Sequence, residues 1–521
     1  MLASYLPPNP SLEQLRKQAK EFRDLVRTGH AKFTEPVRRL HPRLAQAPPP
    51  SGWAGFTLAD AQLVVARAYG FPSWKRLREH LDRLTRYSRS PQRRPTDPVG
   101  AADEFLRLAC LTYRVAWRAD PGEEPDDPGR PTRARQLLAE HPELASASIY
   151  TAAAVGDVAA ARAWLAADPA IAGRDGGPHR WPPLLYAAFS RVDTTQAGHS
   201  TLEVAGLLLE HGADPNAGYV PDGDPPPVTA LSGAFRGQDP INQPAHPYGP
   251  QLARMLLDAG ADPNDQRALD HAGRYPHDDG YLPLFLSYGL GRGSGGPWRA
   301  RLGHVLPTPA ALVEDELRYA AMMDRPERVR LLLRHRAELD LNLDATVDAP
   351  EGPYTAHDMA VLAGNADIAE RLAAVGARVR PLEPVDQLLA ACMRADHTEV
   401  QRLLTGDQGL AQRAVGTQWA VPFAPNPLHF AALFGRADAV RLLASVGFPV
   451  NDRRLSPLHV AALAGHLDLV RLLVELGSDP TAEAVDDETP GQFSPPDRTP
   501  LGWARYNRQD HVVAYLSGIT A

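Results

Sequence analysis

Histidine, aspartate and tyrosine side chains suited to metal binding or proton transfer recur in the middle of the chain. They are His199, Asp239, His246, Tyr248, His271, Tyr275, His277, Asp278 and Asp279. Imidazole and carboxylate groups are good ligands for divalent metals, and a histidine beside a carboxylate can act as a general acid or base. Their spacing matches no specific zinc motif. The competing interpretation is that they lie in loops that are solvated or contact another protein.

A second charged group is basic and lies near the N-terminus: Lys75, Arg76, Arg78, Arg83 and Arg86. It follows residues 66–70 and a turn, a spacing that imitates a helix-turn-helix. Basic faces attract phosphates without regard to nucleotide sequence. The competing interpretation is a solvated helix face, or contact with an acidic partner, because Trp74, Leu77 and Leu81 form an apolar stripe on the same stretch. We favour the second interpretation, so nucleic acid is an unlikely partner.

Signatures of the common catalytic sites are missing from the sequence. It has no phosphate-binding loop with its Lys-Ser/Thr, no Gly-x-Ser-x-Gly and no His-Glu-x-x-His. The run of glycines over residues 289–296 has no βαβ unit around it, which favours a loop over a dinucleotide site. We therefore expect no cofactor and no catalytic residue, and the sequence leans against an enzyme.

The elements that position these residues come from a repeat. Residues 427–432 and 457–462 both read Pro-Leu-His-x-Ala-Ala, thirty positions apart, and each is followed by an apolar stretch that ends at Gly447 or Gly477. Proline suits the first position of a helix because the N–H that it lacks would have no partner there. The unit is therefore two short helices and a connector.

This unit resembles the ankyrin repeat, which has a period of about 33 residues and opens with Thr-Pro-Leu-His-x-Ala. About eleven copies, many degenerate, can be traced over residues 99–518. The resemblance implies an all-α solenoid of helix-turn-helix units. It also implies a structural role, with hydrogen bonds within and between repeats, for His357, His429 and His459. The function it implies is a non-catalytic scaffold that binds another protein along its groove.

In two adjacent units the loop between the helices is about ten residues longer than in the clearest unit. The opening Leu and the closing Gly are Leu184 and Gly212 in one and Leu231 and Gly260 in the next. Because equivalent loops of neighbouring repeats lie side by side, we expect the nine residues above to converge at one edge. The alternative function is therefore an enzyme, or a small-ligand or metal-binding protein, that uses the loops near residues 190–281.

A small helical domain precedes the array. Apolar residues at three- and four-residue spacing between Leu12 and Val26 predict an amphipathic helix, and about four helices are expected over residues 1–87. Residues 88–98, rich in Ser, Pro and Arg, predict a flexible linker. The long Gly-rich segment at 289–308 predicts a bend or interruption of the array. The combination resembles bacterial ankyrin-repeat proteins that carry such a module.

The net charge of −7 divides between these parts: residues 1–97 carry +10 and the remainder −17. An acidic array should prefer a basic or mixed partner. The two cysteines, Cys110 and Cys392, exclude a disulfide scaffold and a four-thiolate zinc site. No apolar run approaches the roughly 20 residues that span a membrane. These features predict a cytoplasmic protein.

Overall fold

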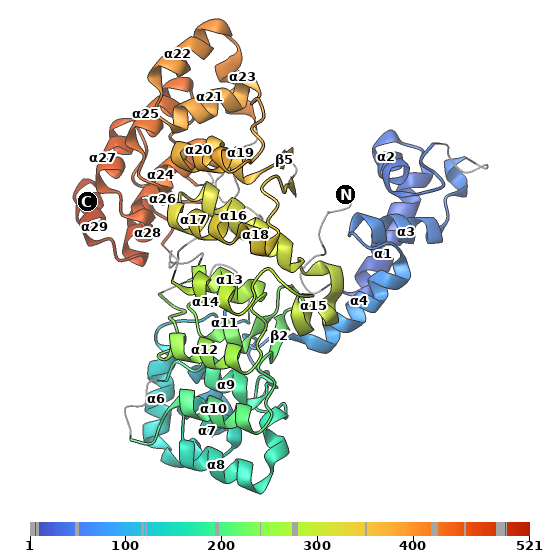
Figure 1. Ribbon diagram of the computed structural model, residues 1–521, viewed down its shortest axis with the longest axis vertical. Helices are drawn as coiled ribbons and strands as arrows, with labels where there is room; N and C mark the ends of the chain where they lie inside the picture. The colour runs from blue at the N-terminus through green and yellow to red at the C-terminus, as the bar shows by residue number, and fades with distance from the viewer. Residues whose placement is uncertain are drawn as a thin grey trace.

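A computed structural model describes the chain apart from short gaps. It covers residues 6, 10–46, 52–115, 119, 122–192, 197–239, 241–273, 280–349, 352–417, 426–452, 455–485, 495 and 497–520. Its helices form a long array with a smaller helical module beside its middle (Figure 1). The predicted all-α solenoid with a preceding helical domain is confirmed.

The N-terminal module contains α1 (Leu12–Arg27), α2 (Ala31–Leu40), the short 3-10 helix η1 (Trp53–Gly55), α3 (Leu58–Ala68) and α4 (Trp74–Tyr87). Ser11 caps α1 by accepting a hydrogen bond from the backbone N–H of Gln14, and Thr57 and Asp60 form a capping box on α3. The buried stripe of α1 meets Phe56 and the buried face of α3 to form a separate apolar core. The module therefore has a core of its own.

The array is built from helix pairs. In the N-terminal part these are α5 (Ala101–Ala109) with α6 (Arg130–Glu140), α7 (Ile149–Val155) with α8 (Val158–Ala167), α9 (Pro183–Phe189) with α10 (Thr201–Glu210), α11 (Ala230–Gly233) with α12 (Gly249–Asp258), and α13 (Gln266–Gly273) with α14 (Tyr281–Ser287). Short 3-10 turns, η3 (Pro142–Ser146) and η4 (Pro169–Gly173), follow α6 and α8.

After a segment that holds α15 (Gly296–Leu302) and η5 (Gly303–Val305), the pairs continue. They are α16 (Pro309–Met322) with α17 (Pro326–Arg334), α19 (Ala356–Leu362) with α20 (Ala366–Ala374), α21 (Pro384–Met393) with α22 (His397–Gly406), α24 (Pro427–Leu433) with α25 (Ala437–Val446), α26 (Pro457–Ala464) with α27 (Leu467–Glu475), and α28 (Pro500–Tyr506) with α29 (Asp510–Thr520). Two short helices, α18 (Arg336–Leu339) and α23 (Leu410–Gly416), lie between pairs.

The clearest repeats show why the sequence breaks into short helices. Asn426 caps α24, and its side-chain oxygen accepts from the backbone N–H groups of Leu428 and His429. Gly465 ends α26 with φ of 81°, a left-handed conformation that glycine adopts at little cost. Between these signals, Leu and Ala side chains are buried against the neighbouring first helices.

Strands are few in the described residues. The hairpin β2 (Gly218–Pro221) and β3 (Val228–Thr229) pairs antiparallel, and β1 (Ser88–Arg89) joins it in parallel, with Ser88 opposite Val220. A second hairpin joins β4 (Val347–Ala349) to β5 (Gly352–Tyr354). The β2–β3 hairpin is largely buried against the array, since Tyr219, Val220 and Val228 are at most 1 % exposed.

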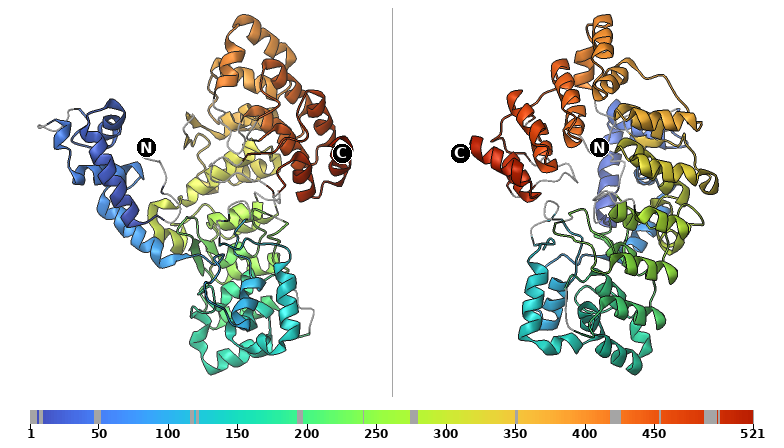
Figure 2. Two further views of the ribbon diagram at one scale, coloured as in Figure 1. Left: turned by 180° about the vertical axis from the view of Figure 1, so that it is seen from behind. Right: turned by 60° about the vertical axis from the view of Figure 1, so that its left-hand side comes forward.

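The apolar core crosses the segment at which the sequence predicts a bend. One buried cluster runs from Phe105 to Ala377 and includes Leu290 and Leu312 on either side of α15. A second cluster runs from Tyr319 to Leu516. α15 and η5 stand between the helix pairs in this segment. The array turns back near α21 to α23, so that the C-terminal pair returns toward α13 and α14 (Figures 1 and 2).

The segment around α15 receives the N-terminal module. Leu84 of α4 packs with Val220, Trp298, Leu302 and Leu306 in a small apolar cluster of its own. The rings of Tyr87 and Trp298 meet edge to face, 5.4 Å between centroids. This insertion therefore gives the array a place at which α4 docks.

Residues 88–98, for which the sequence predicts a flexible linker, begin with an ordered contact to the array. Ser88 and Arg89 form β1, the Ser90 hydroxyl donates to Asp222 at 2.6 Å, and the Gln92 amide donates to the same carboxylate at 2.5 Å. The predicted flexible linker is therefore corrected: Ser88 and Arg89 pair with the hairpin, and the side chains of Ser90 and Gln92 bond to it. The remainder, residues 95–98, is exposed.

Candidate functional site

His246 lies in the loop between α11 and α12, and its ring joins three repeat segments. Its Nε2 lies 3.1 Å from the Thr201 hydroxyl and 3.2 Å from the Ala187 carbonyl oxygen. Burial lowers the pKa of His246 to about 3, with the positive charge of Arg191 acting in the same direction. The other ring nitrogen, Nδ1, accepts from the Tyr248 N–H at 3.1 Å, so both nitrogens have partners within the chain and the ring supports the loop.

His271, on α13, is also buried, but among different neighbours. Its ring stacks on Tyr113, 4.9 Å between centroids and 29° between planes. Burial, with the nearby charge of Arg267, lowers its pKa to about 3. The Tyr113 hydroxyl donates to the carbonyl of Ser232 at 3.3 Å. His271 therefore packs inside the array, apart from His246.

Asp239 is 2 % exposed and joins the loop after α11 to the last repeat. The hydroxyl of Tyr506, at the end of α28, donates to Asp239, and the Asn242 amide donates to Asp239 at 2.7 Å. Asn242 also lies 3.0 Å from the Tyr506 hydroxyl oxygen. These three side chains, which we call the clasp, connect the loop after α11 to the last repeat, more than 260 residues later in the sequence.

The other members of the predicted edge are placed separately. Tyr248 is 37 % exposed, and its ring centroid lies 6.0 Å from that of His246. His199 is half-buried, and its backbone bridges to Asp157. Tyr275, His277, Asp278 and Asp279 lie outside the described residues.

The five described members thus bond to separate neighbours and do not converge on one point. Over the residues that the structure covers, no three His, Cys, Asp or Glu side chains are grouped to hold a metal ion. Sequence spacing identified the inserted loops, but it did not show that their polar groups turn inward.

A segment of the chain itself lies against the first helices of the N-terminal repeats. Residues 110–115 and 122–127, which we call the strap, belong to the connection between α5 and α6 and contact the later repeats. The Leu111 N–H donates to the Phe189 carbonyl at 2.9 Å, at the end of α9, and the Tyr219 hydroxyl of β2 donates to the Thr112 carbonyl at 3.2 Å. With Tyr113 against α11 and α13, the strap covers the surface formed by α9, α11, α13 and the hairpin.

Asp126 anchors the far end of the strap. Its carboxylate accepts from Arg130 at 2.5 Å, from the Thr112 N–H at 3.0 Å and from the Gln243 amide at 3.0 Å. Burial raises the pKa of Asp126, although the charge of Arg130 opposes this. Gln243 also accepts from the Asp239 N–H at 3.3 Å, so one hydrogen-bonded chain links the strap to the clasp.

Arg191 holds three parts of the chain together: helix α9, the loop that follows α11, and the strap. It is 6 % exposed, and its guanidinium donates to the carbonyls of Pro244 at 2.8 Å, Gly233 at 2.9 Å and Ala188 at 3.1 Å. A buried charge is tolerated only when its hydrogen bonds are made. No sequence motif points to Arg191, and a basic side chain just after a helix end is the signal that could have identified it.

The basic residues of α4 do not form one free face. Arg76 pairs with Glu79 at 3.0 Å, and Lys75 lies 4.0 Å from the same carboxylate. Arg83 donates to the carbonyl of Arg301 at 3.4 Å, in the docking segment. Arg86 lies over the Tyr87 ring, and Arg78 is exposed. The group is thus divided between internal ion pairs, solvent and the contact with α15.

Histidines at the repeat openings make contacts between repeats. His459 Nδ1 lies 2.8 Å from the Ser456 hydroxyl, and its Nε2 lies 2.9 Å from the Arg498 carbonyl. His429 bonds in the same way to the Leu455 carbonyl. His357 takes the equivalent place on α19, but its Nδ1 has no partner in the described part of the chain.

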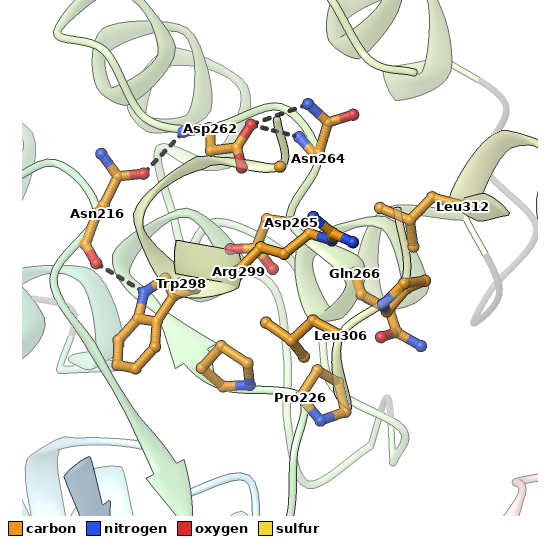
Figure 3. A pocket seen from close by; sticks show the side chains of 13 residues that line it. Asn216, Pro226, Asp262, Asn264, Asp265, Gln266, Trp298, Arg299, Leu306 and Leu312 are labelled. Atoms are coloured by element: carbon orange, nitrogen blue, oxygen red, sulfur yellow. Dashed lines mark hydrogen bonds between the residues drawn. The ribbon is translucent and has the colours of Figure 1, made fainter. Parts of the chain in front are cut away.

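Asparagines at the repeat ends make a second recurring contact. The Asn216 amide donates to Gly260 at 3.0 Å and accepts from the Asp262 N–H at 2.8 Å. Asn264 bonds in the same way to Arg292 and Gly291, one repeat later. Figure 3 shows Asn216, Asp262 and Asn264 in this row. These two asparagines therefore tie their repeats to the following segment through backbone groups.

The family of these repeats follows from a comparison with family models. The ankyrin-repeat model matches in three copies over residues 388–484 and in one over residues 179–218. The chain is an ankyrin-repeat protein. No curated protein matches the chain. Ankyrin repeats generally bind other proteins.

In this ankyrin-repeat protein the two matched regions present different surfaces. Residues 179–218 hold α9 and α10, whose inner side the strap covers. In the region 388–484, α24 and α26 pack on each other and on the neighbouring helices α21, α25, α27 and α28. Val379 and Val485, in the connectors that precede α21 and α28, are 62 % and 55 % exposed.

The hollow between the ankyrin repeats and α15 is too small for a ligand. Pro226, Gln266, Leu306 and Leu312 surround a cavity of about 30 Å³, enough for one water molecule (Figure 3). Trp298 closes it and donates its indole N–H to the Asn216 carbonyl at 2.9 Å. Among the described helices, none has the length and apolar character needed to cross a membrane.

Proposed function

We propose that this ankyrin-repeat protein is a non-catalytic scaffold that binds a protein partner through its C-terminal repeats, residues 384–520, and the connector that precedes them. The observation that carries the proposal is the strap, which fills the corresponding surface of the N-terminal repeats with the chain's own residues. A partner would have to break a buried hydrogen-bond network to bind there. Within the described residues of the C-terminal repeats, no segment like the strap lies against the first helices.

The connectors of the C-terminal repeats offer apolar contacts beside acidic ones. Val379 and Val485 are large apolar side chains that are more than half exposed. Apolar anchors that lose their water on binding supply much of the affinity of a protein interface. With the acidic balance of the array, these anchors favour a basic or mixed protein partner.

The alternative functions have less support. A ligand or metal site at residues 190–281 has little support, because the described side chains do not meet at one place. His246, His271 and Asp239 contact separate neighbours. Nucleic-acid binding by the N-terminal module is disfavoured because Arg83 and Arg86 lie beside the docking segment. We further propose a cytoplasmic location, supported by the two free, buried cysteines.

Affinity capture with surface variants tests the proposal. The full chain carrying Val379→Asp together with Val485→Asp should retain about tenfold less of any partner than the unchanged chain, because each charge disrupts an apolar contact. Val99→Asp is the matched control, since Val99 is also exposed but lies at the start of the N-terminal repeats. A partner retained equally by the double variant, and lost from the Val99→Asp control, would contradict the assignment.

A further inference from the structure

A second hollow lies where α4 ends beside the array, and it is large enough for a small molecule. Its volume is about 390 Å³, within the range of small-ligand pockets. The end of α4, strand β1, α15 and the ends of two repeats surround it. The charged lining residues are Arg86, Arg89, Asp175, Asp214 and Arg301.

The lining of this hollow carries more positive than negative charge, with three arginines against two aspartates. Arg89 lies 3.3 Å from Asp175 and Arg301 lies 3.4 Å from Asp214, and these carboxylate side chains are 53 % and 49 % exposed. Such half-exposed pairs contribute little. Arg86 has no ion-pair partner in the part of the chain that the structure describes.

The arginines are held in place by other contacts. Arg89 donates to the carbonyl of Arg86 at 3.0 Å and to that of Ser88 at 2.9 Å. The guanidinium of Arg301 lies 4.8 Å from the Trp298 ring centre and 5.6 Å from that of Tyr87. Arg86 lies 5.7 Å from the same Tyr87 centre. Two positive charges thus flank one ring, at a position fixed by the docked aromatic side chains.

We propose that Arg86, Arg89 and Arg301 form an anion site that binds the phosphate group of a small ligand. Guanidinium groups form paired, charge-assisted hydrogen bonds with phosphate oxygens, which are stronger than bonds to a neutral group. The bound phosphate replaces the weak contacts to Asp175 and Asp214. It also supplies the negative charge that Arg86 lacks.

The site spans two parts of the molecule. Arg86 and Arg89 belong to the end of the N-terminal module and β1, whereas Arg301 belongs to the segment inserted in the array. A ligand that binds all three arginines therefore favours the docked position of the module. Binding and docking are then linked, because a ligand stabilises the state to which it binds.

Isothermal titration of the full chain with inorganic phosphate and with pyrophosphate, at constant ionic strength, tests the site. We expect saturable binding of at least one of these anions. Arg86→Gln and Arg301→Gln should each weaken it by about tenfold or more, because each removes a charged donor. Arg78→Gln is the control, since Arg78 lies on the same helix and is exposed; it should leave the affinity unchanged.

A second measurement separates loss of the site from loss of folding. Arg86 is exposed, so its variant should keep the far-ultraviolet circular dichroism and the melting temperature of the unchanged chain. Protease cleavage within the exposed residues 95–98 should be slowed by pyrophosphate in the unchanged chain but not in Arg86→Gln. The proposal would be overturned if neither phosphate nor pyrophosphate bound, or if Arg78→Gln weakened binding as much as Arg86→Gln.

Discussion

The N-terminal repeats, residues 101–287, and the C-terminal repeats, residues 384–520, use the same helix pair but connect it differently. In the N-terminal repeats the strap and the loop after α11 fold inward onto α9, α11 and α13. In the C-terminal repeats the helices within and between α24 to α27 are joined by short connections. Added chain length has therefore turned a surface that could bind a partner into part of the interior.

The two regions also differ in what they bury. The N-terminal interior contains buried arginine and aspartate side chains that hydrogen bond to their neighbours, and three histidines with strongly lowered pKa values: His179, His246 and His271. The C-terminal interior is a row of Leu, Ala and Val side chains with one histidine per opening in α24 and α26. Buried polar networks destabilise strongly when one partner is lost. The N-terminal repeats should therefore be the more sensitive to single polar substitutions.

Arg191→Ala should have the largest effect on this comparison. The substitution leaves the carbonyls of Pro244, Gly233 and Ala188 buried without a donor. We expect it to lower the free energy of unfolding by about 3–5 kcal/mol. Hydrogen exchange should show lost protection in α9, α11 and the strap, with α24 to α27 unchanged. Arg441→Ala, an exposed arginine on α25, is the control. Equal loss of protection in both regions would show that the array unfolds as one unit.

Acid should weaken both regions over different ranges of pH. His246 and His271 have pKa values of about 3 and His459 of about 4, whereas an unfolded histidine titrates near 6.5. The unfolded chain therefore takes up protons first, so stability is complete above pH 6.5 and falls as the pH decreases. At pH 5 each histidine costs about 2 kcal/mol. The loss ends near pH 4 for His459 but continues to about pH 3 in the N-terminal repeats.

Urea unfolding between pH 7 and pH 4.5 measures this loss. His271→Gln should flatten the dependence of the unfolding free energy on pH, since the group that titrates is removed. His141→Gln should not, because that side chain is 48 % exposed. A pH dependence that His271→Gln leaves unaltered would rule out this histidine as its source.

The asparagine contacts between repeats should respond alike in the two regions. Asn264→Ala removes hydrogen bonds of 2.8 and 3.1 Å, and Asn451→Ala removes bonds of 2.7 and 2.9 Å to Gly477 and Asp479. Each should lower the unfolding free energy by about 1–2 kcal/mol. Chemical denaturation of the two variants compares them directly. If Asn264→Ala lowered the unfolding free energy much more than Asn451→Ala, the buried polar network of the N-terminal repeats would also depend on these asparagine contacts.

Tyr506→Phe should have the smallest effect on stability, about 1 kcal/mol, because it removes only the hydroxyl of the clasp. Small-angle scattering should show a larger radius of gyration as the last repeat moves away from the loop after α11. Tyr248→Phe, an exposed tyrosine in the same loop, is the control. An unchanged radius would show that packing near α21 to α23 alone fixes the curvature.

Sequence reasoning predicted the repeat because its signals are local. Pro427, Asn426 and Gly465 fix where helices begin and end, and these effects act within one or two turns. The same reasoning predicted long loops near residues 190–281 but not their direction. Asp239 and His246 resemble exposed ligands in sequence, yet their partners come from α28 and α9.

The amino-acid sequence by itself thus determined the helix pairs, their order and the charge difference between module and array. Only the tertiary structure decided that the strap covers the first helices of the N-terminal repeats, that Ser88 and Arg89 pair with the β2–β3 hairpin, and that Tyr506 reaches Asp239. The physical reason is range. Helix caps depend on neighbouring residues, whereas the position of a polar loop depends on which distant groups complete its hydrogen bonds once the array has curved.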